Sequence, residues 1–181
     1  MKYIVRTTGE RDIGYLQDAI PELIVTTEGS DAMEGFVSAL RLAGDSPTVH
    51  LEDDLVLCRD FKNRLEAIVA EHPSEVVQLF SMRKDDLTEG TRRIPGRRFC
   101  MGQCFYLPRG MSRDILSYYE AGWKRIQEHP TGLDLMVADY LGDNRISYLN
   151  IVPNLVDHQP VKSLINPHRS TKRQSLTFKE D

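Results

Sequence analysis

The sequence contains few cysteines and no long apolar run. Its three cysteines, Cys58, Cys100 and Cys104, are odd in number and lack the paired spacing of a metal site. They predict free thiols in a reducing compartment. No apolar stretch approaches the roughly 20 residues of a membrane span, and the N-terminus turns polar after Val5, unlike a secretory signal. We therefore expect a cytoplasmic protein with no membrane partner.

Positive charge is also in deficit. With 23 Lys and Arg against 27 Asp and Glu, the formal net charge is −4, so the chain as a whole is not a basic nucleic-acid binder. Basic residues nevertheless cluster at 92–98 and 168–175, and each cluster taken alone indicates a solvated loop. The residues concerned are Arg92, Arg93, Arg97, Arg98, Arg169, Lys172 and Arg173.

The pattern of the chain predicts a single α/β domain. Its 181 residues suffice for one sizeable core, and short β-branched runs alternate with segments of helical period. This alternation predicts a mostly parallel central sheet covered by helices on both faces, a Rossmann-like arrangement. Strands are expected at 3–8, 23–27, 48–51, 75–82, 100–108 and 146–158, helices at 11–21, 31–44, 60–73, 112–126 and 133–141, and an arginine-rich loop at 83–98.

The segment VHLEDDLVLC (49–58) places Glu52, Asp53 and Asp54 between two apolar runs. Negative charge at the rim of a buried strand is costly unless it is paired or binds a cation. Ligands of parallel sheets bind at the carboxyl ends of the strands, and clustered carboxylates suit Mg²⁺ or Mn²⁺ held together with substrate phosphates. The acidic triplet therefore predicts a divalent-cation site for a phosphorylated ligand.

The longer segment VHLEDDLVLCRDF (49–61) resembles the metal-binding DXD-type segment of glycosyltransferases with the GT-A fold, which use nucleotide-sugar donors. The triplet is similar to that of enzymes that build bacterial surface polysaccharide, and the tail to short bacteriophage proteins of this type. The resemblance implies a GT-A-like domain at 1–165 and a basic tail at 166–181, in the host cytoplasm if a bacteriophage encodes the chain. Four further segments match the family in order: RTTGER (6–11), CMGQCFYLP (100–108), GLDLMVADYL (132–141) and NLVDHQPVKS (154–163).

The resemblance implies a role for each matching residue. Asp54 and His158 would bind Mn²⁺ or Mg²⁺, and the donor would be a nucleotide sugar, most simply a UDP-sugar. Asp134 would be the general base of an inverting enzyme or a binding residue of a retaining one. Contacts to the nucleotide, ribose and diphosphate fall to Arg6, Thr8, Arg11, Glu52, Asp53, Gly102, Lys162 and Ser163.

The acceptor stays open at this point. One interpretation is DNA with a hydroxymethylated base, held through the basic residues at 92–98 and 168–175, because lysine and arginine bind the phosphate backbone and a flipped base can enter an open site. The other is a glycan. Two further classes compete: a nucleotidyltransferase or phosphohydrolase, which would need a second acidic motif, and a non-catalytic nucleic-acid-binding module. The sugar, the stereochemistry and the oligomeric state are also open.

Overall fold

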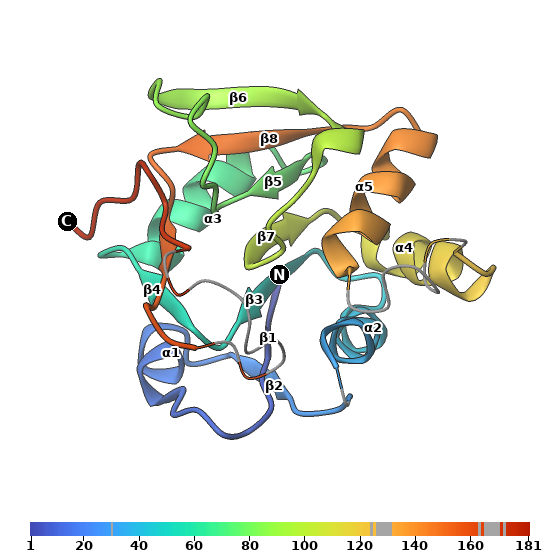
Figure 1. Ribbon diagram of the computed structural model, residues 1–181, viewed down its shortest axis with the longest axis horizontal. Coiled ribbons are helices and arrows are strands. Elements are labelled where there is room, and N and C mark those ends of the chain that lie inside the picture. The colour runs from blue at the N-terminus through green and yellow to red at the C-terminus, as the bar shows by residue number, and fades with distance from the viewer. Residues whose placement is uncertain (30, 124, 126–131, 163, 165–170, 172) are drawn as a thin grey trace.

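A computed structural model describes the whole chain except residues 30, 124, 126–131, 163, 165–170 and 172. Within these residues the centre is a seven-stranded sheet of order β2-β1-β3-β7-β5-β8-β6 (Figure 1). Five of the seven strands run in one direction, while β7 and β6 are antiparallel to their neighbours. The mostly parallel α/β sheet expected from the sequence is therefore confirmed. The strands are β1 (Lys2–Arg6), β2 (Ile24–Thr26), β3 (Thr48–Glu52), β5 (Val76–Gln78), β6 (Gly90–Pro95), β7 (Cys104–Leu107) and β8 (Ser147–Val152).

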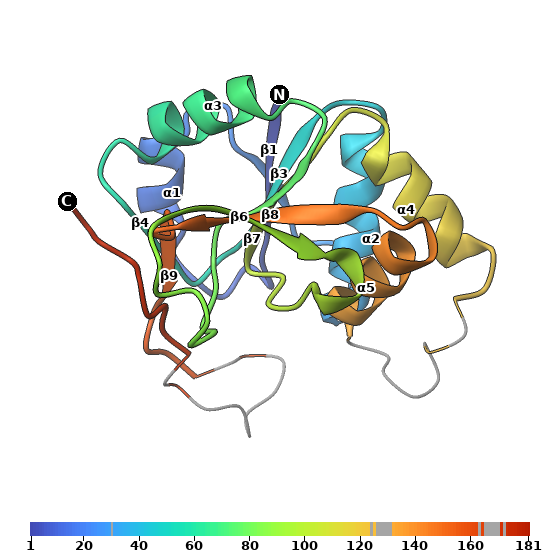
Figure 2. The same ribbon diagram turned by 90° about the horizontal axis from the view of Figure 1, so that it is seen from above.

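Helices cover both faces of this sheet. Figure 2 shows α1 and α3 on one face and α2, α4 and α5 on the other. Each face has its own apolar core, with Leu16 and Leu65 packed in the first and Phe36 and Met136 in the second. Among the described residues, no helix has the length and apolar character to cross a membrane. The helices are α1 (Gly14–Ala19), α2 (Ala32–Ala43), α3 (Phe61–Glu71), α4 (Met111–Glu120) and α5 (Leu133–Asp143), with a 3₁₀ turn at Gly96–Arg98.

Local signals place α2 as expected. The Asp31 side chain accepts hydrogen bonds from the backbone N–H groups of Met33 and Glu34, at 2.8 and 2.9 Å. These bonds satisfy donors that a helix start leaves unpaired. The helix ends at Gly44, whose backbone angles (φ 57°, ψ −127°) suit glycine because it has no β-carbon.

A second, two-stranded sheet lies beside the first. β4 (Leu55–Leu57) pairs antiparallel with β9 (Val156–His158), and Leu55 is opposite His158. The segment expected as one run at 146–158 is thus two strands, β8 and β9, each in a different sheet. This pairing brings the end of the domain next to the acidic triplet.

The expectation of a loop at 83–98 is wrong. Its second half forms β6, which pairs antiparallel with β8 at the edge of the sheet, and then the 3₁₀ turn. Polar residues are compatible with an edge strand because its outer side faces water. The helix expected at 112–126 is also shorter, since α4 ends at Glu120 before Gly122 (φ 89°), and Ile126 lies outside the described residues.

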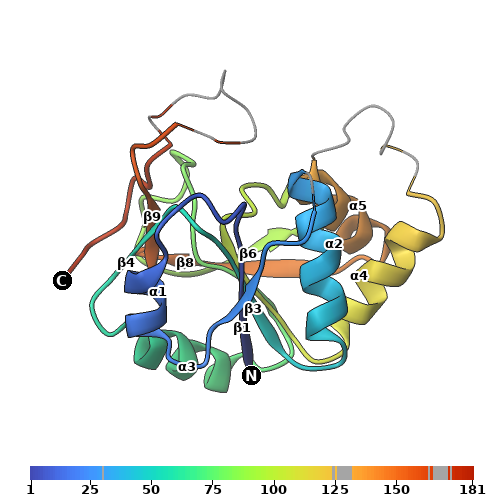
Figure 3. The ribbon, with the colours of Figure 1, turned by 90° about the horizontal axis from the view of Figure 1, so that it is seen from below.

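The described C-terminal residues pack against the domain. Arg59 N–H donates to Glu180 O at 2.8 Å, and Phe178 packs on the core shared with α1 and α3. Ser175 N–H donates to Asp157 Oδ1 at 2.6 Å. Figure 3 shows this segment running beside β9 and β4, so residues 173–181 reach the edge of the acidic turn.

Candidate metal site

The acidic turn joins the two sheets. Glu52 is the last residue of β3, and Asp53 and Asp54 form the turn into β4. Asp53 and Asp54 are 7% and 4% exposed. The triplet therefore ends a strand of the main sheet, at its carboxyl end, as the sequence predicted.

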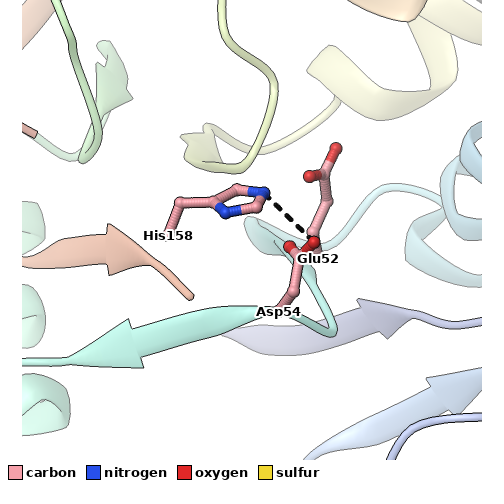
Figure 4. Close-up of side chains that lie close together, drawn as sticks. All are labelled: Glu52, Asp54 and His158. Carbon is pink, nitrogen blue, oxygen red and sulfur yellow. Dashed lines mark ion pairs between the residues drawn. The ribbon is translucent and has the colours of Figure 1, made fainter. Parts of the chain in front are cut away.

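His158 faces Asp54 from the opposite strand. The β4–β9 pairing and a hydrogen bond from Gln159 N–H to Asp54 O, 2.8 Å long, hold the two segments together. His158 Nε2 lies 3.1 Å from Asp54 Oδ2, and Figure 4 shows the imidazole directed at the carboxylate, with Glu52 beside it. Residues more than a hundred positions apart thus share one small site.

The contacts of His158 define which nitrogen faces the carboxylate. Its Nδ1 lies 2.6 Å from the carbonyl oxygen of Gln159, so Nδ1 carries the proton and donates it. In the neutral ring, Nε2 then carries a lone pair that can bind a cation, whereas a ring protonated on both nitrogens forms an ion pair with Asp54 Oδ2 at 3.1 Å. Histidine ligands of metals typically have this arrangement, with the second ring nitrogen donating to a carbonyl or carboxylate.

The site fits a divalent cation on two grounds. One ligand atom each from Glu52, Asp54 and His158 lies within 4.8 Å of the others. Asp54 Oδ1 and His158 Nε2 are buried without a hydrogen-bond partner in the part of the chain that the structure describes, a costly state for polar atoms. In an octahedral Mg²⁺ site with bonds of about 2.1 Å, neighbouring ligand atoms are about 3 Å apart, close to the spacing of Asp54 Oδ2 and His158 Nε2.

The two outer carboxylates differ in their pKa. Burial raises the pKa of Glu52, although Arg6 opposes the shift. Burial also acts to raise the pKa of Asp54, but His158, Arg11 and Arg173 outweigh it and the pKa is lowered. Asp54 is thus held as a carboxylate, the form that binds a cation.

Three arginines of the described ranges lie around the turn. Arg6 Nη2 lies 3.8 Å from Glu52 Oε1 and donates to the carbonyl of Gly102 at 2.7 Å. Arg11 Nη1 lies 2.6 Å from Asp53 Oδ1 and 2.9 Å from Asp54 Oδ2. Arg173, from the segment predicted to contact DNA, lies 4.0 Å from Asp54 Oδ2.

Asp53 accepts hydrogen bonds from residues that follow β1. Its carboxylate accepts from Thr7 Oγ1 at 2.7 Å and from Arg11 Nη1 at 2.6 Å, and its carbonyl accepts from Tyr15 Oη at 3.2 Å. Thr8, which the resemblance selected, is exposed. The sequence did not identify Thr7 or Tyr15 as contacts of the turn. In the case of Thr7, two adjacent threonines give no signal for which one faces the turn.

The remaining candidates lie on neighbouring loops. Asp134, in the first turn of α5, accepts from Met101 N–H at 3.2 Å, next to the Gly102 carbonyl that Arg6 binds. A β-carbon at Gly102 would overlap Leu133, so this glycine permits close packing of the loop on α5. Lys162 is exposed, and its carbonyl accepts from Arg11 Nη2 at 2.8 Å. Ser163, Arg169 and Lys172 lie outside the described residues.

The arginines at 92–98 lie elsewhere, on and after β6. Each has a carboxylate within 4.0 Å, so the positive charge of this surface is locally compensated. The pairs are Arg92–Asp86, Arg93–Glu75, Arg97–Asp143 and Arg98–Asp85.

Comparisons with known proteins bear on the fold. No family model matches the chain, and no curated protein matches it significantly in sequence. The structure of A197 from STIV is similar, with a TM-score of 0.52 at 14% identity, covering 99% of this chain and 95% of A197. At this identity the likeness shows a shared fold.

Two enzymes give weaker likenesses. A putative glucose-1-phosphate thymidylyltransferase from Bacillus anthracis has a TM-score of 0.48 at 10% identity, with 86% of this chain and 69% of that one covered. The CTP:phosphocholine cytidylyltransferase of Streptococcus pneumoniae has a TM-score of 0.44 at 10% identity, with 87% and 72% covered.

Proposed function

We propose that this protein is a metal-dependent glycosyltransferase that uses a nucleotide-sugar donor. The observation that carries the proposal is the meeting of Glu52, Asp54 and His158, with an unpaired Nε2 and an unpaired Oδ1 among the described residues. Their position at the carboxyl end of β3 is where an α/β sheet binds its ligands. The DXD-type resemblance of this same segment supplies the reaction class.

The residues of the site have two proposed roles, binding the cation and binding the phosphates of the donor. Asp54 and His158 would hold it, and Glu52 completes the group. When bound, a divalent cation neutralises negative charge on the departing diphosphate. Arg11 lies beside Asp54 with its side chain 17% exposed, so its guanidinium can turn to phosphate oxygens, which arginine binds through two N–H groups at once.

Asp134 is the proposed general base if the reaction inverts the anomeric centre. Its carboxylate is fixed by Met101 N–H on the loop that Arg6 anchors through Gly102. A base must be held within hydrogen-bond reach of the acceptor hydroxyl, and this loop ties its position to the acidic turn. In a retaining reaction Asp134 would bind the acceptor instead.

The proposed acceptor carries a hydroxyl group. A hydroxymethylated base in DNA is one candidate and a glycan is the other; the arginines at 92–98 do not favour DNA, because each is already paired with a carboxylate. Mass analysis of both acceptor types after incubation with donor and Mn²⁺ distinguishes them. The same analysis separates sugar transfer from nucleotidyl transfer, since only the latter leaves a nucleotide on the acceptor.

Thermal unfolding with Mn²⁺ and a panel of nucleotide sugars tests the site itself. A ligand that binds only the folded protein stabilises it, by about 2.7 kcal/mol at a hundredfold excess over Kd. We expect a uridine nucleotide sugar with Mn²⁺ to raise the melting temperature of the wild type. Asp54→Asn should abolish the rise, and His158→Ala should reduce it less because the carboxylates remain.

Asp45→Asn is the matched control. Asp45 is an exposed aspartate paired with Arg113 at 2.7 Å, and it precedes the start of β3, whereas the acidic turn follows the end of that strand. It should leave the ligand-induced rise intact. No rise in the wild type with any nucleotide sugar, with Mn²⁺ present, contradicts the proposal.

A further inference from the structure

The acidic turn already has a matching set of positive charges, and this inference about them rests on the proposed cation site. Glu52, Asp53 and Asp54 provide three carboxylates. In the part of the chain that the structure describes, three guanidinium groups lie within 4.0 Å of them, from Arg6, Arg11 and Arg173. The protein's own side chains therefore neutralise the turn before a cation binds.

The three arginines differ in burial and in the hydrogen bonds that hold their guanidinium groups. Arg6 is 8% exposed and its Nη2 donates to Gly102 O. Arg11 donates to Asp53 and to the carbonyl of Lys162. Arg173 Nη2, at 4.0 Å from Asp54 Oδ2, is beyond hydrogen-bond distance, and its buried Nε has no partner among the described residues. Arg6 Nε also has no partner among the described residues, but Arg6 is anchored through its Nη2. Arg173 is therefore the least engaged of these three guanidinium groups.

The position of Arg173 is nevertheless fixed by the residues that follow it. Ser175 N–H donates to Asp157 Oδ1 at 2.6 Å, and Ser175 Oγ donates to Asn154 Oδ1 at 2.7 Å. Asp157 directly precedes His158, so the segment that carries Arg173 is tied to the strand that carries the proposed ligand. The side chain of Arg173 is only 13% exposed. It belongs to the site and not to a free basic tail.

We propose that Arg173 makes the site selective for a cation that arrives with an anionic ligand. A bare divalent cation would add two positive charges to a turn that is already neutralised, and Arg173 repels it. A cation carried by a nucleoside diphosphate brings its own negative charge, and the unpaired N–H groups of Arg173 can bind that charge. Arg173 therefore weakens binding of the bare cation and strengthens binding of the complex.

Mn²⁺ titrations with and without saturating UDP test this selectivity, using Arg173→Gln and, as matched control, Lys179→Gln. Lys179 lies in the same segment and pairs with the exposed Glu89 at 2.9 Å. Because one nearby positive charge is removed, Arg173→Gln should bind Mn²⁺ alone about tenfold more tightly. The factor by which UDP increases Mn²⁺ affinity should fall about tenfold or more. Lys179→Gln should match the wild type in both titrations.

Arg173→Lys separates charge from hydrogen bonding. It keeps the positive charge, so Mn²⁺ alone should bind as weakly as to the wild type, while the UDP effect should fall in part because lysine lacks the forked donors. Equal Mn²⁺ affinity of the wild type and Arg173→Gln, or an unchanged UDP effect, would overturn the inference and leave the cation site standing. A wild type that binds no Mn²⁺, with or without UDP, overturns the proposed function itself.

Discussion

The arginines on and after β6 and those at the acidic turn all pair with carboxylates, but the surroundings of the two sets differ. The set on and after β6 is exposed, from 39% for Arg92 to 64% for Arg97. The set at the acidic turn is buried, with 8%, 17% and 13% exposure for Arg6, Arg11 and Arg173. Ion-pair distances overlap between the sets, from 2.6 to 4.0 Å.

Similar distances therefore have different consequences in the two places. Water and salt screen the pairs of Arg93, Arg97 and Arg98, so these pairs contribute little to stability, whereas Asp86, the partner of Arg92, is itself buried. At the turn, burial is the first cause of the lowered pKa of Arg6 and of the raised pKa of Glu52. Removing the partner of a buried charge lowers the stability of the folded protein. Each charged residue of the turn therefore relies on its partners for its contribution to stability. The surface arginines depend little on their partners.

The largest effect should come from breaking the buried set. Arg6→Met keeps the length of the side chain but leaves Glu52 without its nearest guanidinium and the Gly102 carbonyl without its donor. We expect a loss of about 3–5 kcal/mol in the free energy of unfolding, the usual cost of removing one partner of a buried pair. Arg93→Met, which breaks the exposed pair with Glu75, should lower the free energy of unfolding far less, because water screens this pair.

Urea denaturation of both variants at neutral pH measures this difference. Circular dichroism before denaturation checks that each variant is folded. Equal losses in the two variants would show that burial does not distinguish the two sets of arginines.

A smaller effect should separate the two outer carboxylates by pH. The folded state raises the pKa of Glu52, so the wild type loses stability as the pH rises through that folded pKa. Glu52→Gln avoids this loss and should be more stable than the wild type at neutral pH. The advantage should vanish in acid.

Asp54→Asn should show the opposite sign. The pKa of Asp54 is lowered in the folded state, so its carboxylate contributes stability above the unfolded pKa, and this contribution is lost as the pH falls through the folded pKa. The variant should be less stable than the wild type at neutral pH and equal to it in acid. Unfolding free energies measured from pH 3 to 8 without metal check both signs, and the same sign for both variants would contradict the electrostatics of the turn.

Local signals were sufficient to predict part of the fold and site. The cap at Asp31, the glycine end of α2 and the acidic turn after β3 each depend on residues adjacent in the sequence. The position of His158 beside Asp54 depends on the β4–β9 pairing across about a hundred residues, and only the family resemblance indicated it. Composition alone gave no reason to select this histidine.

Other features could not be predicted because tertiary contacts decide them. The arginine-rich sequence of β6 predicted a loop. It forms an edge strand instead, which pairs with β8 on its inner side. Arg173 read as part of a solvated tail, yet the anchor at Ser175 places it at the acidic turn. In both cases the sequence shows the charge, and the fold decides which charges are buried.

The smallest effect concerns the exposed set and the DNA interpretation. Replacing Arg92, Arg93, Arg97 and Arg98 by Gln removes four positive charges, but each already faces a carboxylate. We therefore expect duplex DNA binding to weaken by about fivefold or less at 0.1 M salt, with the slope of log K against log salt changing by about 1, where four free phosphate contacts would change it by about 3.6. Arg41→Gln with Arg113→Gln, which removes two arginines that are also paired with exposed carboxylates, is the control for net charge. A loss of a hundredfold or more, with the full change in slope, would mean that the carboxylates release these arginines to phosphates and that this face holds a DNA acceptor. The exposed pairs would then be as responsive to a ligand as the buried ones, and the contrast between the two sets would fail.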